Sequence, residues 1–284
     1  MTSSRCSKSF LTYNIPGVES ARICLIKSPT RMKSRLLSWR PSVRAGVLAV
    51  GALLALASLP LGIHAQQQLS KHYPAGKNVR IELKNISGTI VVESWNKDEI
   101  RLSATIESKG AHVIPRQIEE SLIVDVMSDN RGMGDVGDIN FKLQVPVNSN
   151  VDLETRRGNI SVANIRSGLV RAHVSSEGDI TLSNINAAHV IAQNVIGDIF
   201  FDGEFSSGGT YEFKSNKGNI TIRIPGDSAF RLVAASPARR IALNDFWNNN
   251  FRTQDGRKYV GDVGDGRSSV SVTNFSGQIT FLRR

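Results

Sequence analysis

A short phrase, glycine followed by aspartate or asparagine and then isoleucine, returns about every 20 residues along this chain of 284 residues. The glycines of its five full copies are separated by 21, 20, 19 and 21 positions. Two looser copies, with threonine or glutamine in the second position, stand near the ends of the repeat region. Repeats of this period indicate a stack of units, each burying its apolar face against its neighbours. The seven glycines are Gly88, Gly137, Gly158, Gly178, Gly197, Gly218 and Gly277.

The residues between the glycines alternate in polarity. Counted from the glycine as the first residue, the third and fifth are apolar, and a second apolar pair follows about ten residues later. Period-two alternation bounded by turn residues is typical of strands with one buried face. We therefore predict an all-β, single-domain stack of β-solenoid or β-roll type, with rungs of about 20 residues and two short strands each. The first pairs are Ile160/Val162, Ile180/Leu182, Ile199/Phe201 and Ile220/Ile222, and the second pairs are Val170/Ala172, Val190/Ala192, Tyr211/Phe213 and Phe230/Leu232.

Each repeated glycine is expected at a corner between two strands. Such a turn commonly needs a positive φ, and a neighbouring Asp or Asn can bond to nearby backbone amides. Calcium binding is the alternative for these aspartates. Calcium-binding rolls repeat about every nine residues with acidic ligands, whereas here neutral Asn interchanges with Asp, which favours the turn role. A twin Gly-Asp-Val-Gly-Asp phrase at 134–138 and 261–265 is a better metal candidate, although two flexible glycine turns explain it more simply.

Residues 32–65 have the organisation of a secretory signal. Basic residues precede an uncharged run at 45–61, and Ala65 occupies the small position that signal peptidase prefers. We predict cleavage after Ala65 and an exported product that is periplasmic, cell-surface or secreted. An uncleaved signal would be the alternative, and then the sole membrane anchor. Translation is expected to start at Met32, which makes residues 1–31 a non-native extension.

The basic character of the chain belongs to its N-terminal part. Of 35 basic and 25 acidic residues, the first 65 positions hold nine and one, leaving 26 and 24 in the rest. Without a basic surplus interleaved with aromatics, nucleic-acid binding has no support. Both cysteines, Cys6 and Cys24, precede Met32, so disulfides and thiol chemistry are excluded for the exported form.

The predicted mature chain consists of a polar lead-in, 66–78, and the stack, 79–284. A weak helical pattern covers 116–121, and 244–259 interrupts the repeat as a polar loop with isolated aromatics. Such a loop can contact a sugar or a protein partner, or can fold back as a plug over the end of the stack. The plug is favoured, and the candidate contacts are Phe246, Trp247, Phe251 and Arg252.

Catalysis would need paired carboxylates, or a carboxylate beside a cation. No spacing orders the acidic residues into such a pair, and charged outward positions are expected on any alternating strand. The histidines are scattered, and no nucleotide, phosphate or nucleophile motif occurs. We therefore expect no catalytic, cofactor or metal residues. The residues considered for catalysis are Asp125, Asp152, Glu154, Arg156 and Arg157.

Three stretches resemble a known family. They are the opening strands from 79 to 106 with Trp95-Asn96, the S-x-x-G-D/N-I rungs, and the ending Asn274-Phe275-Ser276-Gly277-Gln278-Ile279. Together they are similar to the bacterial "putative adhesin" domain family of unknown function, over about residues 79–282. The resemblance implies an exported β-solenoid-like domain and brings no catalytic residues with it.

The expected function is a non-enzymatic, adhesin-like binding or structural module at the bacterial cell envelope. Its partner would be a cell-surface glycan or an envelope protein. The rivals are a polysaccharide-active β-helix enzyme and a scaffold accessory in envelope-stress regulation.

Overall fold

The computed structural model describes residues 67–76, 78–107, 110–128, 137–237 and 240–284. The predicted signal peptide and N-terminal extension lie outside these residues. Within them the chain forms one 19-stranded sheet, and its single helix is a short 3-10 turn, η1 (Asn244–Phe246). The all-β solenoid class is confirmed.

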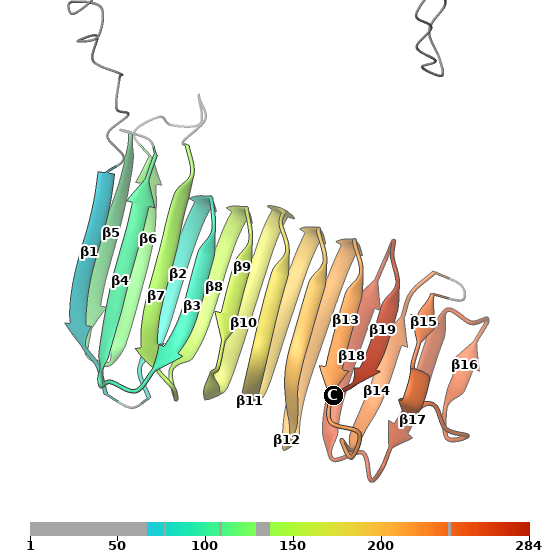
Figure 1. Ribbon diagram of the computed structural model, residues 1–284. Helices are drawn as coiled ribbons and strands as arrows, with labels where there is room; N and C mark the ends of the chain where they lie inside the picture. The colour runs from blue at the N-terminus through green and yellow to red at the C-terminus, as the bar shows by residue number, and fades with distance from the viewer. Residues whose placement is uncertain (1–66, 77, 108–109, 129–136, 238–239) are drawn as a thin grey trace, which may run out of the picture. The chain divides into compact units, whose positions relative to one another are not determined.

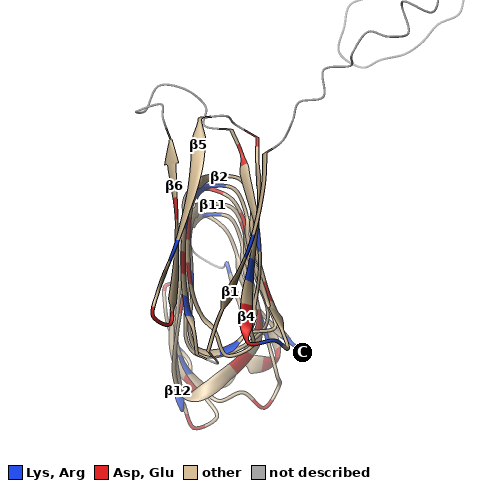
Figure 2. Cartoon of the chain, turned by 90° about the vertical axis from the view of Figure 1, so that its left-hand side faces the viewer, with Lys and Arg blue, Asp and Glu red and all other residues tan. Residues whose placement is uncertain are grey.

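The sheet is folded so that two sides face each other across the core (Figures 1 and 2). Side 1 holds the strands that follow the corner glycines, and side 2 those that precede them. Side 1 runs in the order β1 (Gln67–Pro74), β4 (Glu99–Ile106), β7 (Ile139–Pro146), β3 (Ile90–Trp95), β9 (Ile160–Ala163), the starts of β11 (Ile180–Ile196) and β12 (Ile199–Lys217), β13 (Ile220–Ile224), β19 (Ile279–Arg283) and β15 (Ile241–Ala242).

Side 2 completes each rung. Its order is β5 (Ala111–Ile118), β6 (Ser121–Ser128), β2 (Arg80–Ser87), β8 (Asn150–Arg157), β10 (Arg166–Glu177), the ends of β11 and β12, β18 (Ser268–Asn274), β14 (Phe230–Ala235), β17 (Lys258–Val263) and β16 (Arg252–Gln254).

The rungs do not stack in sequence order. The first rung, β2 with β3, lies between β6–β7 and β8–β9. The last, β18 with β19, lies between the β12–β13 rung and β14–β15. The closing strand β19 is therefore an internal rung and does not cap the stack. Ile241 of β15 is paired with Ile279, although no glycine precedes it at the corner position.

The core consists of ladders of like residues, one from each rung. Paired neighbours keep the apolar positions aligned, so that each ladder forms a continuous buried column. The predicted apolar pairs are all fully or almost fully buried. One ladder on side 1 runs Ile90, Ile160, Ile180, Ile199, Ile220 and Ile279.

Several elements differ from the sequence prediction. In β11 and β12 the chain bends from side 1 to side 2 through irregularities in register, so two short strands become one long strand. The lead-in contains β1, which pairs with β4, so the stack begins at Gln67. The weak helical pattern at 116–121 is a hairpin, since β5 and β6 pair antiparallel across a tight turn with φ of 51° at Glu119.

Candidate functional site

Six of the seven predicted corner glycines form a column along one edge of the stack. Gly137 does not belong to it, because Ile139 is the residue stacked on Gly88. A Cβ on Gly158 would lie 2.1 Å from the carbonyl oxygen of Gly88, and one on Gly178 would lie 2.0 Å from that of Gly158. The column continues in the same way to Gly197, Gly218 and Gly277, all at positive φ. Glycine is therefore required for two reasons: the backbone conformation and the close approach of the next rung.

The residue after each glycine forms a ladder of its own. The Oδ1 atom of Asn159 accepts from the backbone N–H of Asp179 at 2.9 Å, and Asp179 accepts from Asp198 at 2.8 Å. Asp198 and Asn219 repeat the contact with the rungs that follow. Because only an acceptor oxygen is used, Asp and Asn serve equally well. These hydrogen bonds to backbone amides account for the interchange of Asp and Asn at this position.

A second set of polar side chains lies buried behind the corners. The amide of Asn274 donates to the carbonyl of Gly218 at 2.7 Å, and the hydroxyl of Ser236 donates to that of Gly277 at 3.1 Å. In the same way, Asn194 donates to the carbonyl of Gly178 and Ser215 donates to the carbonyl of Gly197. Sequence reasoning had not assigned these residues a role. For Asn194, Ser215 and Asn274, a position three residues before a glycine was the available signal. Ser236 has no glycine at that spacing.

The two aspartates of the second Gly-Asp-Val-Gly-Asp copy, at 261–265, are paired with arginines. Asp262 accepts two hydrogen bonds from Arg231, at 2.8 and 3.1 Å, and this contact lowers the pKa of the Asp262 carboxyl. Asp265 is paired with Arg267. Most of the first copy lies outside the described residues. Within those residues, no group of three or more His, Asp and Glu gathers as metal ligands do.

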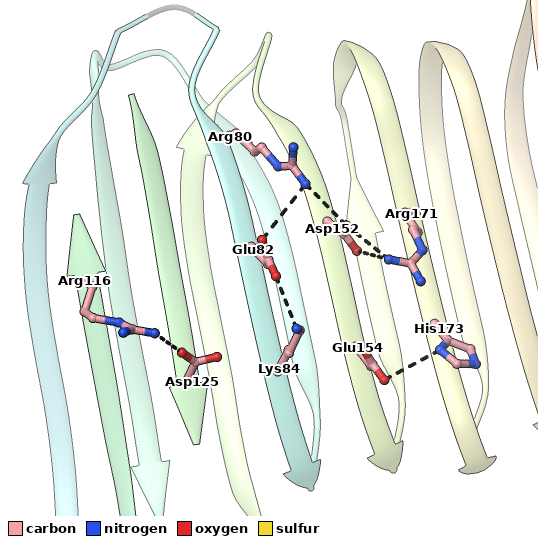
Figure 3. Close-up of polar contacts among 9 residues, drawn as sticks. All are labelled: Arg80, Glu82, Lys84, Arg116, Asp125, Asp152, Glu154, Arg171 and His173. Atoms are coloured by element: carbon pink, nitrogen blue, oxygen red, sulfur yellow. Dashed lines mark hydrogen bonds and ion pairs between the residues drawn. The ribbon is translucent and has the colours of Figure 1, made fainter. Parts of the chain in front are cut away.

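The carboxylates considered for catalysis lie on side 2, each beside a basic side chain (Figure 3). Asp152 lies between Arg80 and Arg171, with nitrogen–oxygen distances of 3.8 and 3.1 Å. Glu154 faces His173 at 3.8 Å, and Asp125 is paired with Arg116. The pairs link neighbouring strands, which is the arrangement of a charged outer surface on a sheet.

The other residues of that set, Arg156 and Arg157, are exposed at the glycine edge at the end of β8. His173 is in register with Gln193, and His189 with Leu169. The two histidines therefore do not stack, as their spacing predicts.

The segment 244–259 closes the C-terminal end of the core. Phe246 is buried between Phe230 and Phe281, with ring centroids 5.9 and 6.3 Å away. Phe251 is 8 % exposed. Neither can present its ring to a partner, because each is covered by its own chain. Both side chains therefore cover the C-terminal end of the core.

Trp247 and Arg252, in contrast, are exposed. The indole is 51 % exposed, stacks on Phe251 at 5.7 Å with a 15° interplanar angle, and meets Tyr259 edge-on at 5.9 Å. The amide of Asn248 fixes the segment by donating to the Asp262 carbonyl at 3.0 Å. The indole is therefore a supported aromatic surface beside an arginine.

The repeat geometry agrees with a family model. The model described as Toastrack DUF4097 matches residues 74–281, which is most of the chain. The chain belongs to the Toastrack family. No curated protein matches this Toastrack chain.

Three of the solved structures that match this chain are described below. A "putative cell adhesion protein" from Clostridium sporogenes is 11% identical, with a TM-score of 0.49, and the match covers 77% of this chain and 100% of that one. A "putative adhesin" from Bacteroides fragilis is 10% identical, with a TM-score of 0.32 and coverage of 78% and 99%. A "putative lipid binding protein" from Parabacteroides distasonis is 10% identical, with a TM-score of 0.28 and coverage of 76% and 97%. At such identities the likeness concerns the fold alone.

In the described part of this Toastrack chain, no helix has the length and apolar character needed to cross a bilayer.

Proposed function

We propose that this Toastrack protein is an exported, non-enzymatic binding module of the bacterial cell envelope, with a glycan-binding surface centred on Trp247. The observation on which this proposal rests is the exposed indole of Trp247, which stacks on Phe251 and meets Tyr259 edge-on. A flat aromatic ring with one face open suits the apolar face of a sugar ring. Exposed Asn249, Asn250 and Arg252 offer hydrogen-bonding groups beside it.

A binding role is supported by the side-chain contacts of the acidic residues on side 2. A general acid or base needs a carboxyl group directed at a substrate. The carboxylates of Asp125 and Asp152 are instead paired with arginines of the chain itself, and that of Glu154 faces His173. Cleavage of an acidic polysaccharide that Asp152→Asn abolishes would overturn the non-enzymatic proposal.

Export is proposed from the sequence of residues 32–65, in which basic residues precede an uncharged run that is followed by Ala65. Intact-mass measurement of the exported protein should give a chain that begins at Gln66. A product that keeps the apolar segment would instead indicate an anchored form.

The glycan proposal is tested with one substitution and one control. Trp247→Ala should reduce binding to bacterial surface-glycan preparations by about tenfold, because stacking on an aromatic contributes on the order of 1 kcal/mol. Phe275→Ala is the control, since Phe275 is 61% exposed at the glycine edge and lies outside the proposed surface. Point substitution is preferable to deleting 244–259, which would remove Phe246 from the core.

Equal glycan binding by wild type and Trp247→Ala would contradict the proposal. The proposal would also be contradicted if Trp247→Ala lost binding to an envelope protein extract while its glycan binding stayed unchanged.

A further inference from the structure

A polar depression lies on the edge opposite the glycine corners, where the chain passes from side 1 back to side 2. Its volume is about 610 Å³, which is within the range of small-molecule sites. No carboxylate and no aromatic ring lines it. The lining residues are Asn78, Asn148, Asn150, Arg166, Ser167, Gly168 and Asn186.

Backbone hydrogen bonds fix three chain segments around this depression. The N–H of Asn150 donates to the carbonyl of Val79 at 2.9 Å, which joins the start of β8 to the start of β2. The N–H of Arg166 donates to the carbonyl of Val147 at 2.8 Å, which joins β10 to the turn before β8. The polar groups are thus held on a rigid frame, which reduces the entropic cost of binding.

The floor of the depression is kept low by a glycine. A Cβ on Gly168 would lie 3.2 Å from the Oδ1 atom of Asn150. That oxygen already accepts from the backbone N–H of Leu169 at 2.9 Å, which orients the amide of Asn150 and leaves its NH₂ group outward. A larger side chain at 168 would fill the space.

Three exposed side chains at the rim have unused hydrogen-bonding capacity. Within the described residues, Asn78, Asn148 and Arg166 have no side-chain hydrogen bond and no ion pair. The arginines nearby differ, since Arg80 and Arg171 share Asp152 (Figure 3). Arg80 is in register with Asn150 and adds positive charge at the same edge.

We propose that this depression binds an acidic saccharide through a uronic acid residue. The planar Arg166 guanidinium can pair with the sugar carboxylate through two parallel hydrogen bonds. The amides of Asn78, Asn148 and Asn150 both donate and accept, as sugar hydroxyls require. The side chains that line the depression are all polar, which suits a saccharide better than an acyl chain, and a neutral sugar has no charge for Arg166. The site is separate from Trp247 and does not rest on the proposed role of that residue.

Titration with trigalacturonate, followed by ligand-observed NMR and calorimetry, tests the proposal. We expect saturable binding by the 66–284 chain that is at least tenfold tighter than binding of neutral maltotriose. Arg166→Gln should weaken trigalacturonate binding by about tenfold, because it removes one charge-assisted pair. Gly168→Val should also weaken it, by filling the depression while Arg166 is retained.

Arg156→Gln is the matched control, because Arg156 is an exposed arginine of β8 near the glycine edge. It lies six residues beyond Asn150, which is about 20 Å along a strand, and should bind like wild type. Trp247→Ala should bind trigalacturonate normally, so failure of the glycan surface and failure of this site are distinguishable. The proposal is overturned by equal affinity for the two saccharides, or by unchanged binding in both Arg166→Gln and Gly168→Val.

Discussion

At the scale of single residues, the corner glycines are the positions where this chain tolerates the least change. In Gly178→Ala the new methyl would be placed 2.0 Å from the Gly158 carbonyl oxygen, at a φ of 153°. We expect a loss of about 3 kcal/mol in the free energy of unfolding, from backbone strain and displacement of the next rung. Urea denaturation of the purified chain measures it.

Gly208→Ala separates the two causes of that loss. Gly208 also has a positive φ, 75°, but no atom lies within 4 Å of a Cβ placed there. Only the backbone cost of about 1 kcal/mol should remain. Equal losses at 178 and 208 would show that close stacking of the rungs is not the constraint.

Tyr211 couples stability to alkaline pH. Its buried hydroxyl donates to the Ala187 carbonyl at 2.8 Å and accepts from the Ser206 N–H at 2.6 Å. Burial raises the pKa of Tyr211 above its usual value of 10.0. Since the folded state then holds a proton that the unfolded chain releases, this contribution is complete below pH 10 and is lost as the pH rises further.

Tyr211→Phe should therefore cost about 1–2 kcal/mol at pH 7, because the Ser206 N–H loses its acceptor. The difference from wild type should shrink as the pH rises above 10 in urea denaturation. The pKa of Tyr73 is also raised by burial. Because Tyr73 is present in both proteins, its contribution to the pH dependence of stability cancels in the difference. A difference that stays constant with pH would contradict this account.

At the scale of elements, the position of β19 sets it apart from an ordinary C-terminal strand. It lies between β13 and β15, and Ile279 and Phe281 are fully buried. We expect its amides to exchange hydrogen as slowly as those at the start of β12, although β19 ends one residue before the C-terminus. The amides of edge strand β16, which is exposed throughout, should exchange fast.

Hydrogen–deuterium exchange with mass spectrometry provides the comparison. Peptides covering 279–283 and 252–254 report the two strands, and 199–202 provides the internal reference. Fast exchange at 279–283 would place β19 at an open end of the stack.

The strands and corners could be predicted from sequence because each depends on local chemistry. Alternating apolar residues specify a half-buried strand, and a glycine with Asp or Asn specifies the turn. The order of the rungs could not be predicted. Val92, Val162 and Leu182 occupy equivalent positions in one ladder, and side chains of such similar size allow almost any rung beside any other.

The candidate sites depend on that unpredicted order. Asn78 lies near Asn148 and Arg166 only because β2 is inserted beside β8. The end segment was identified by its composition, yet alternation could not distinguish buried Phe246 from exposed Trp247. Phe246 is internal because η1 turns it onto Phe230 and Phe281.

At the scale of the whole molecule, the first and last rungs in the sequence are inserted between other rungs. Strand β2 pairs with β6 and β8, and β18 pairs with β12 and β14. Long-range pairing of this kind makes folding slow, since distant segments must meet before their contacts stabilise the chain.

The place of β18 and β19 has a consequence for a chain made from one end to the other. Until residues 268–284 leave the ribosome, β12 and β14 have no strand to join them. An incomplete chain can pair its earlier rungs but cannot finish its C-terminal rungs. Completion of the stack thus waits until residues 268–284 are available, and a nascent chain that lacks them stays open between β12 and β14.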